Sequence, residues 1–187
     1  MFDLKSARHW AEALICEKLE RGMRAVDATM GNGGDTERLC RLVGEEGLVW
    51  AFDLQKEAVE RTAARLAQAG LAARARLIHA GHEHMREHVT EPVDAVVFNL
   101  GWLPGGDKTI TTRAETALQA LDNATELLKR GGLLTVCVYP GHPEGNEERR
   151  RVLEWAERLD PKRFAVLRTA YLNQPNSPPE LVAVQAL

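Results

Sequence analysis

Residues 26–36 read Val-Asp-Ala-Thr-Met-Gly-Asn-Gly-Gly-Asp-Thr, and the fold can be worked out from this stretch. It begins as the end of an apolar strand, passes through three glycines and opens a helix, with Asp35 or Thr36 expected as the helix cap. Gly31 and Gly33 let the backbone turn sharply and approach a ligand closely. The helix start presents unpaired backbone amides to polar ligand atoms. The stretch therefore predicts a ligand-binding corner between a strand and a helix.

Two kinds of ligand are considered for this corner, a dinucleotide and S-adenosylmethionine. A dinucleotide fingerprint needs Gly-x-Gly-x-x-Gly, but the third position here is Thr36. The spacing Asp27-x-x-x-Gly31-x-Gly33 instead resembles the first motif of class I methyltransferases. S-adenosylmethionine carries an ammonium and a carboxylate in place of a pyrophosphate, and a strand-end acid with free loop amides suits that end. The sequence favours S-adenosylmethionine, with a nicotinamide-dependent oxidoreductase as the competing class.

Composition sets broad limits on the protein. At 187 residues, with 44% hydrophobic and 27% charged residues, we expect one globular domain spanning 1–187. A net charge of -3 argues against a wide grip on duplex nucleic acid, although a small RNA footprint remains compatible. The three cysteines have no metal-like spacing, and the chain has neither a membrane-length apolar run nor a signal-peptide layout. We expect a cytoplasmic protein without a bound metal.

Apolar strands alternate with amphipathic helices along the chain, which predicts an α/β fold of the Rossmann-like kind with helices on both faces of a mostly parallel sheet. The expected strands are 25–29, 48–52, 75–78, 93–98, 133–138, 164–169 and 181–187. The expected helices are 6–21, 35–43, 56–69, 83–88, 111–129 and 147–159. No helix separates the last two strands, so they should pair antiparallel. Ligands of such sheets bind beyond the carboxyl ends of the strands.

Asp53 ends the second expected strand, 20 residues after Gly33. A carboxylate at this place can accept hydrogen bonds from both hydroxyls of an adenosine ribose. The alternative is a strand-end aspartate that caps the next helix. Gln55 either joins Asp53 or simply starts that helix.

Asn99-Leu100-Gly101-Trp102 follows the fourth expected strand. Enzymes that methylate exocyclic amines carry Asp/Asn/Ser-Pro-Pro-aromatic here, so the match is in spacing and chemistry. The Asn99 carbonyl can accept a hydrogen bond from a target amine, and Trp102 can stack on a flat base. The alternative is a tight turn with a packed tryptophan. Tyr139 and His142 are the candidate proton acceptors on the neighbouring loop.

Two charged clusters have plainer interpretations. The run His82-Glu83-His84-Met85-Arg86-Glu87-His88 puts two histidines one helical turn apart but offers no evident third metal ligand. We expect a solvated short helix whose entry, Gly81 and His82, flanks the adenine. Arg149-Arg150-Arg151 follows two glutamates and is expected to form salt bridges on a helix face, with RNA phosphates as the alternative partners.

The chain resembles the small bacterial class I enzymes labelled putative rRNA methylases. The resemblance lies in residues 27–36, 52–55, 99–108 (Asn-Leu-Gly-Trp-Leu-Pro-Gly-Gly-Asp-Lys) and 139–142 (Tyr-Pro-Gly-His). It implies a seven-stranded sheet with one antiparallel strand, and N-methylation by S-adenosylmethionine of the 5-aminomethyl group on wobble 2-thiouridine in certain tRNAs. Trp102 departs from the tyrosine expected in many members, which preserves stacking but loses a phenol hydroxyl.

The site expected from the motifs and the resemblance has three parts. The residues expected to bind the cofactor are Asp27, Thr29, Met30, Gly31, Asn32, Gly33, Asp35, Thr36, Asp53, Leu54, Gln55, Gly81, His82, Asn99 and Gly101. Those expected to bind substrate are Trp102, Leu103, Pro104 and Lys108, where Lys108 either contacts a phosphate or is solvated. The expected catalytic residues are Asn99, Trp102, Tyr139 and His142.

The expected partner is RNA, with the tRNA anticodon region favoured and no membrane involved. The oligomeric state is not predicted, although a homodimer is compatible. Methylation of rRNA or of a small-molecule amine stays open, as does a non-catalytic RNA-binding module.

Overall fold

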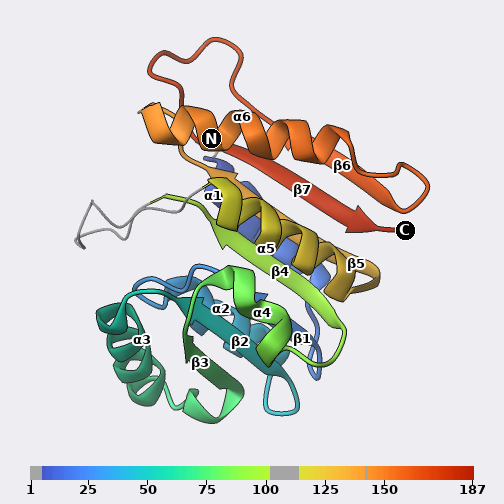
Figure 1. The fold of residues 1–187 in the computed structure, drawn as a ribbon. Coiled ribbons are helices and arrows are strands. Elements are labelled where there is room, and N and C mark those ends of the chain that lie inside the picture. The colour runs from blue at the N-terminus through green and yellow to red at the C-terminus, as the bar shows by residue number, and fades with distance from the viewer. Residues whose placement is uncertain (1–5, 102–113, 142) are drawn as a thin grey trace, which may run out of the picture.

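The computed structural model describes residues 6–101, 114–141 and 143–187. The strands of these residues are β1 (Arg24–Asp27), β2 (Leu48–Asp53), β3 (Ala75–His79), β4 (Val93–Asn99), β5 (Leu128–Val138), β6 (Phe164–Thr169) and β7 (Glu180–Ala186). They form one seven-stranded sheet in the order β3-β2-β1-β4-β5-β7-β6 (Figure 1). Among them β7 alone runs opposite to the direction that the other six strands share, and it pairs antiparallel with both β5 and β6. The expected sheet and its single reversed strand are confirmed.

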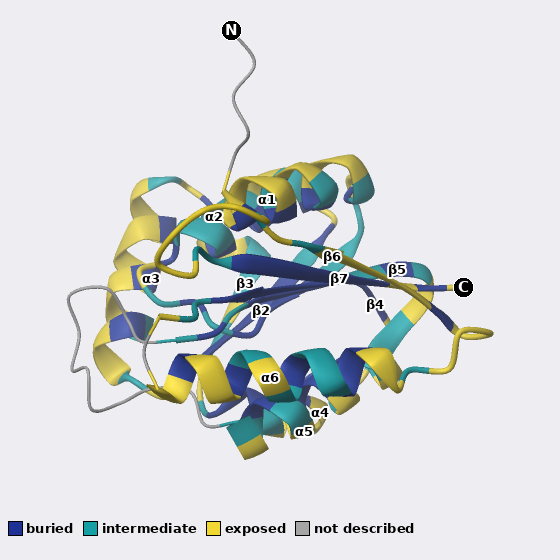
Figure 2. Cartoon of the chain, turned by 90° about the horizontal axis from the view of Figure 1, so that it is seen from above, coloured by how far each residue is buried: buried dark blue, intermediate teal, exposed yellow. Residues whose placement is uncertain are grey.

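The helices cover both faces of the sheet, as Figure 2 shows with the sheet nearly edge-on. One face carries α1 (Ala7–Lys18), α2 (Gly34–Val43) and α3 (Lys56–Gln68), and the other carries α4 (Met85–His88), α5 (Ala114–Leu127) and α6 (Pro143–Glu157). Short 3-10 turns, η1 (Ala72–Arg74) and η2 (His82–His84), precede β3 and α4. No helix in the described ranges is long and apolar enough to cross a membrane.

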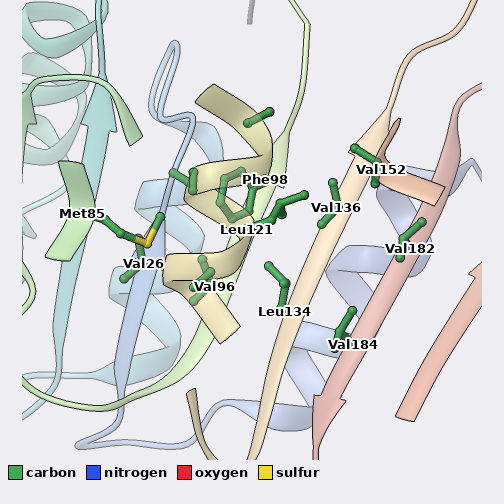
Figure 3. Close-up of a cluster of buried hydrophobic side chains, with 14 of the residues drawn as sticks. Val26, Met85, Val96, Phe98, Leu121, Leu134, Val136, Val152, Val182 and Val184 are labelled. Carbon is green, nitrogen blue, oxygen red and sulfur yellow. The ribbon is translucent and has the colours of Figure 1, made fainter. Parts of the chain in front are cut away.

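The core lies in two layers because side chains alternate between the two faces of each strand. Toward α4, α5 and α6 the strands present Val26, Phe98, Val136 and their neighbours, all fully buried (Figure 3). Toward α1, α2 and α3 they present smaller residues such as Ala25 and Ala95. Burying one large apolar side chain stabilises the fold by about 1.5–3 kcal/mol, so both layers hold the strand ends firmly in register.

The start of α2 differs from the sequence-based expectation. The N-cap is Gly33, with φ of 78° and without a side-chain cap, so the prediction of Asp35 or Thr36 as the cap is wrong. Asp35 and Thr36 lie in the first turn of the helix, where their side chains bond other parts of the site. The first backbone amides of α2 are therefore not covered by a capping side chain.

Other element boundaries also shift. The helix expected to run to residue 129 ends at Leu127, because β5 begins at Leu128 and pairs with Val93 before a register shift. The helix expected from residue 147 begins at Pro143, whose fixed backbone angle suits a first helical turn.

Candidate active site

The site lies where β2, β1 and β4 end side by side at the carboxyl edge of the sheet. Asp53 ends β2, Asp27 ends β1 and Asn99 ends β4. Asp27 pairs in register with Ala51 on one side and Val97 on the other, so the β1–α2 loop lies between Asp53 and Asn99. Three separate motifs of the sequence are thus brought to one edge.

Asp27 is fully buried, and its carboxylate faces protein groups. Oδ2 accepts a hydrogen bond of 2.7 Å from the Thr36 hydroxyl, and Oδ1 accepts one of 3.2 Å from the Thr29 backbone N–H. Burial, with the nearby Asp35 carboxylate, raises the pKa of Asp27 to about 7. Asp27 therefore ties both ends of the glycine loop together.

Each residue of the loop from Thr29 to Gly33 has a defined partner around it. The Met30 backbone N–H donates to the carbonyl of Phe52 over 2.9 Å, and the exposed Asn32 accepts a hydrogen bond from Arg61 over 3.2 Å. Gly31 donates its backbone N–H to Asp53 Oδ2 over 3.0 Å. The loop is fixed before any ligand arrives, which lowers the entropy cost of binding.

Gly33 has a steric reason to be glycine. Its φ of 78° is one that other residues rarely adopt, and a Cβ there would lie 2.8 Å from Thr62 Oγ1. The Thr62 hydroxyl, in α3, also donates to the Gly31 carbonyl over 3.1 Å. Helix α3 is thereby packed directly against the loop. Thr62 was not expected from the sequence, because only the fold brings it to the glycines.

Asp53 lies half-buried with acceptor capacity to spare. Oδ2 accepts the Gly31 N–H, and Oδ1 accepts the Gln55 N–H over 2.9 Å, while a carboxylate offers about four acceptor positions. The next residue, Leu54, leaves 60% of its surface exposed. A hydrogen-bond acceptor for two hydroxyls beside an exposed apolar side chain fits the ribose and adenine of S-adenosylmethionine.

His82 is buried at the start of η2, directly after the buried Gly81. Its Nδ1 donates to the Ala28 carbonyl over 3.2 Å, and its ring meets Phe98 edge-on with centroids 5.6 Å apart. Burial lowers the pKa of His82, so the ring is neutral near pH 7. The ring joins the end of β3 to the end of β1, beside the loop.

Asn99 is held at three points. Its backbone N–H donates to Thr29 Oγ1 over 2.8 Å, and its side-chain Nδ2 donates to Asp35 Oδ2 over 2.9 Å. The Tyr139 hydroxyl donates to its Oδ1 over 3.4 Å. The amide carbonyl therefore points toward Tyr139, at the end of β5.

Asp35 is the hub of a charged cluster. Arg8 of α1 contacts Asp35 Oδ1 at 3.2 Å and Arg38 contacts the same oxygen at 2.5 Å. Glu12 of α1 lies behind them, 3.3 Å from Arg8 and 3.1 Å from Arg38. Neither arginine was expected at the site. Arg8 lies 27 positions from Asp35, and only the packing of α1 places it there, whereas Arg38 follows Asp35 by three residues in α2.

Tyr139 is a donor rather than a base. Burial raises the pKa of its phenol to about 12, so the hydroxyl keeps its proton near neutral pH. Gly101, with φ of 141°, would place a Cβ 3.9 Å from the Tyr139 ring. The expected site residues Trp102, Leu103, Pro104, Lys108 and His142 lie outside the described residues.

The histidine run and the arginine run are engaged in local contacts. His84 bonds Glu87 over 2.8 Å, while the His88 ring meets Phe52 edge-on at 5.8 Å. Arg149 contacts Glu180 at 2.7 Å, and the next two arginines contact glutamates of α5 and α6. Salt bridges on this helix face are confirmed.

Comparison with known proteins places this chain in a family. A family model described as "Putative rRNA methylase" matches residues 49–185. The chain is 38% identical over 188 residues to "tRNA (mnm(5)s(2)U34)-methyltransferase, chloroplastic" of Arabidopsis thaliana, an alignment covering 95% of this chain and 69% of that protein.

Solved structures agree with that match. The chain is similar to a putative rRNA-methylase from Clostridium thermocellum, with a TM-score of 0.98, 44% identity and all of both chains covered. It is also similar to a putative methyltransferase from Streptococcus mutans in complex with SAH, with a TM-score of 0.91 and 36% identity over 99% of this chain and 100% of that one. The chain therefore belongs to the putative rRNA methylase family, whose members are class I methyltransferases that depend on S-adenosylmethionine.

Proposed function

We propose that this protein transfers a methyl group from S-adenosylmethionine to the 5-aminomethyl group of wobble 2-thiouridine in tRNA. The observation that carries this proposal is the placement of Asn99, beside the glycine loop and with its side-chain oxygen turned away from Asp35. Amide oxygens accept hydrogen bonds from amines. The named activity of the Arabidopsis relative supports the same substrate.

The cofactor is proposed to lie across the ends of β2 and β1. Asp53 accepts the ribose hydroxyls, Leu54 packs against the adenine, and Gly81 with His82 closes the far side. The remaining contacts come from Gln55 and from the loop and helix start, namely Asp27, Thr29, Met30, Gly31, Asn32, Gly33, Asp35 and Thr36. The buried carboxylate of Asp27 acts by holding the loop together with the Thr36 hydroxyl, whereas Asp35 acts through its backbone amide at the start of α2, which has no capping side chain.

The chemistry is an in-line displacement in which the bound cofactor supplies the reactive methyl carbon. Asn99 accepts a hydrogen bond from the amine, and this contact directs the lone pair of the amine nitrogen at the methyl carbon. The nitrogen–carbon bond forms as the carbon–sulfur bond breaks, the sulfur keeps the electron pair, and the amine proton passes to solvent. Holding the three atoms in line accounts for most of the rate gain that this chain has to supply.

The substrate side is proposed to be built from residues 99–108 and 139–142. We propose that Trp102 stacks on the base and that Leu103, Pro104 and Lys108 also contact the substrate. We propose His142 as a further catalytic residue. Because Tyr139 keeps its proton, its part is to donate to Asn99. We propose that residues 1–187 carry all of this as one domain in the cytoplasm, acting on the anticodon region.

The direct test uses purified protein, S-adenosylmethionine and tRNA from a strain that lacks the gene. Mass spectrometry of the digested tRNA should show 5-aminomethyl-2-thiouridine converted to its methylaminomethyl form, gaining one methyl group. Ribosomal RNA from the same strain is the matched substrate control, because the family description refers to rRNA. Methylation of rRNA with unchanged wobble uridine would refute the tRNA assignment.

A further inference from the structure

We propose that Asp35 is a positioning residue that fixes which way the Asn99 side-chain amide faces, and so keeps its carbonyl oxygen available to the substrate amine. This inference deepens the proposed function and rests on it for the identity of the amine. Its basis is the arrangement of donors and acceptors around Asn99.

An asparagine amide has two ends of opposite character. Nδ2 can only donate hydrogen bonds, whereas Oδ1 can only accept them. A flipped amide fills the same space but turns N–H groups toward the substrate. The NH₂ end of an amide cannot accept a hydrogen bond, so a flipped Asn99 would not bind the N–H of the substrate amine. The orientation has to be fixed by a neighbour that accepts only.

Asp35 is such a neighbour. As a carboxylate it accepts hydrogen bonds and donates none, and its Oδ2 receives Asn99 Nδ2 over 2.9 Å. The Tyr139 hydroxyl lies 3.4 Å from the other end of the amide, at Oδ1, and burial keeps that hydroxyl protonated as a donor. A flipped amide would lose the bond to Asp35, because an oxygen would face the carboxylate, whereas the Tyr139 hydroxyl could accept from an N–H in place of donating.

Asp35 is itself held in place. Its side chain is 14% exposed, and its Oδ1 contacts both Arg8 and Arg38, which leaves Oδ2 for Asn99. Helix α1 therefore takes part in the site, because its Arg8 contacts the residue that orients Asn99.

Glu12 provides a matched control. It contacts the same two arginines, at 3.3 Å and 3.1 Å, whereas the Asn99 side-chain amide donates to Asp35. Glu12→Ala and Asp35→Ala each remove one carboxylate from the same cluster, and only the second removes the bond to the amide. A general electrostatic role predicts similar losses from both substitutions, whereas a positioning role predicts a loss confined to Asp35→Ala.

The first readout is turnover on tRNA beside cofactor affinity by calorimetry. Asp35→Ala should lower kcat at least tenfold while the Kd for S-adenosylmethionine changes less than about threefold, because misdirected hydrogen bonding acts on alignment. Glu12→Ala should stay within about threefold of wild type in both measurements. Equal losses in kcat from the two variants would overturn the proposal.

The second readout is rescue by exchange. Asn99→Asp places two carboxylates against each other and should lose activity at least tenfold. Adding Asp35→Asn restores the bond with its direction reversed, because the new amide donates to the new carboxylate, and an acceptor still faces the substrate. The double variant should regain at least tenfold over Asn99→Asp. A correctly folded double variant no better than that single variant would overturn the proposal.

The third readout needs no substrate and separates this inference from the proposed function. In 15N-labelled protein the side-chain NH₂ signals of Asn99, identified through Asn99→Ala, should shift toward those of free amides in Asp35→Ala and stay in place in Glu12→Ala. Unshifted signals in Asp35→Ala would overturn the positioning role. Absence of wild-type turnover on tRNA, with the expected shift present, would instead refute only the proposed substrate.

Discussion

Two strand ends of this protein carry the same residue type for different purposes. Asp27, at the end of β1, is fully buried with both carboxylate oxygens bonded to the loop and to α2. Asp53, at the end of β2, accepts two backbone amides and keeps positions free for a ligand. The difference teaches that an acid in a binding motif can act by building the loop, while its neighbour one strand away makes the contact.

The largest effect is expected at Asn99, which lies at the end of β4 and is proposed to align the substrate amine rather than to bind the cofactor. Asn99→Ala should reduce methyl transfer at least about 100-fold, because the amine loses the acceptor that orients it. Cofactor affinity should change little. Single-turnover kinetics and calorimetry on the same variant measure the two quantities. A parallel loss of both would show that Asn99 serves the cofactor.

Asp53→Ala addresses the binding half of the comparison. Removing a charged acceptor of two hydroxyls should raise the Kd for S-adenosylmethionine about 30-fold or more, roughly 2 kcal/mol or more. Calorimetry with the cofactor checks this, and 5′-deoxy-5′-methylthioadenosine, which keeps the ribose, should show the same loss. Unchanged affinity for both compounds would remove Asp53 from the ribose site.

Gly33→Ala tests the part of the comparison that concerns how the glycine loop is built, and it changes no charge. The positive φ and the close approach of Thr62 should lower the free energy of unfolding by about 1–3 kcal/mol. Urea denaturation measures the loss, and Gly70→Ala, with φ of 67° and no heavy atom within 4 Å of its Cβ, is the control for backbone strain alone. Equal losses at both positions would mean that Thr62 contributes nothing.

Asp27→Asn should remove a pH dependence of stability. The pKa of Asp27 is raised to about 7 in the folded protein, above the ordinary value of 3.8, so the folded state binds the extra proton between these values. The contribution of Asp27 to the free energy of unfolding therefore falls as the pH rises from about 4 to 7. Denaturation midpoints should show wild type losing stability relative to the variant over this range. A constant difference would contradict the buried, protonated state.

The smallest effect is expected at Leu54. Leu54→Ser removes an exposed apolar surface beside Asp53 and should weaken cofactor binding about threefold to tenfold, with stability within about 0.5 kcal/mol of wild type. Calorimetry and thermal denaturation check the pair of values. A large loss of stability would mean that Leu54 packs against the protein rather than a ligand.

The sequence predicts most of this fold because the relevant signals are local. Alternating apolar strands and amphipathic helices give the sheet, and the missing helix before residue 181 gives the reversed strand. The positions of Asp53 and Asn99 follow from being last in their strands. The partners of Asp35 and Gly33 do not follow, because Arg8 and Thr62 reach them only through the packing of α1 and α3.

The misplaced cap of α2 has a similar cause. Asp35 and Thr36 are good capping residues, but their side chains find stronger partners in Asn99 and the buried Asp27. Local sequence preference predicts a capping role for these two residues, but their side chains bond other parts of the site instead.

The most direct test of the account is a crystal structure of the protein with S-adenosylhomocysteine bound. We predict the ribose hydroxyls on Asp53, the adenine against Leu54, and the sulfur turned toward Asn99 with the Asp35–Asn99 bond intact. A nucleoside bound elsewhere, or a sulfur facing away from the end of β4, would contradict the account.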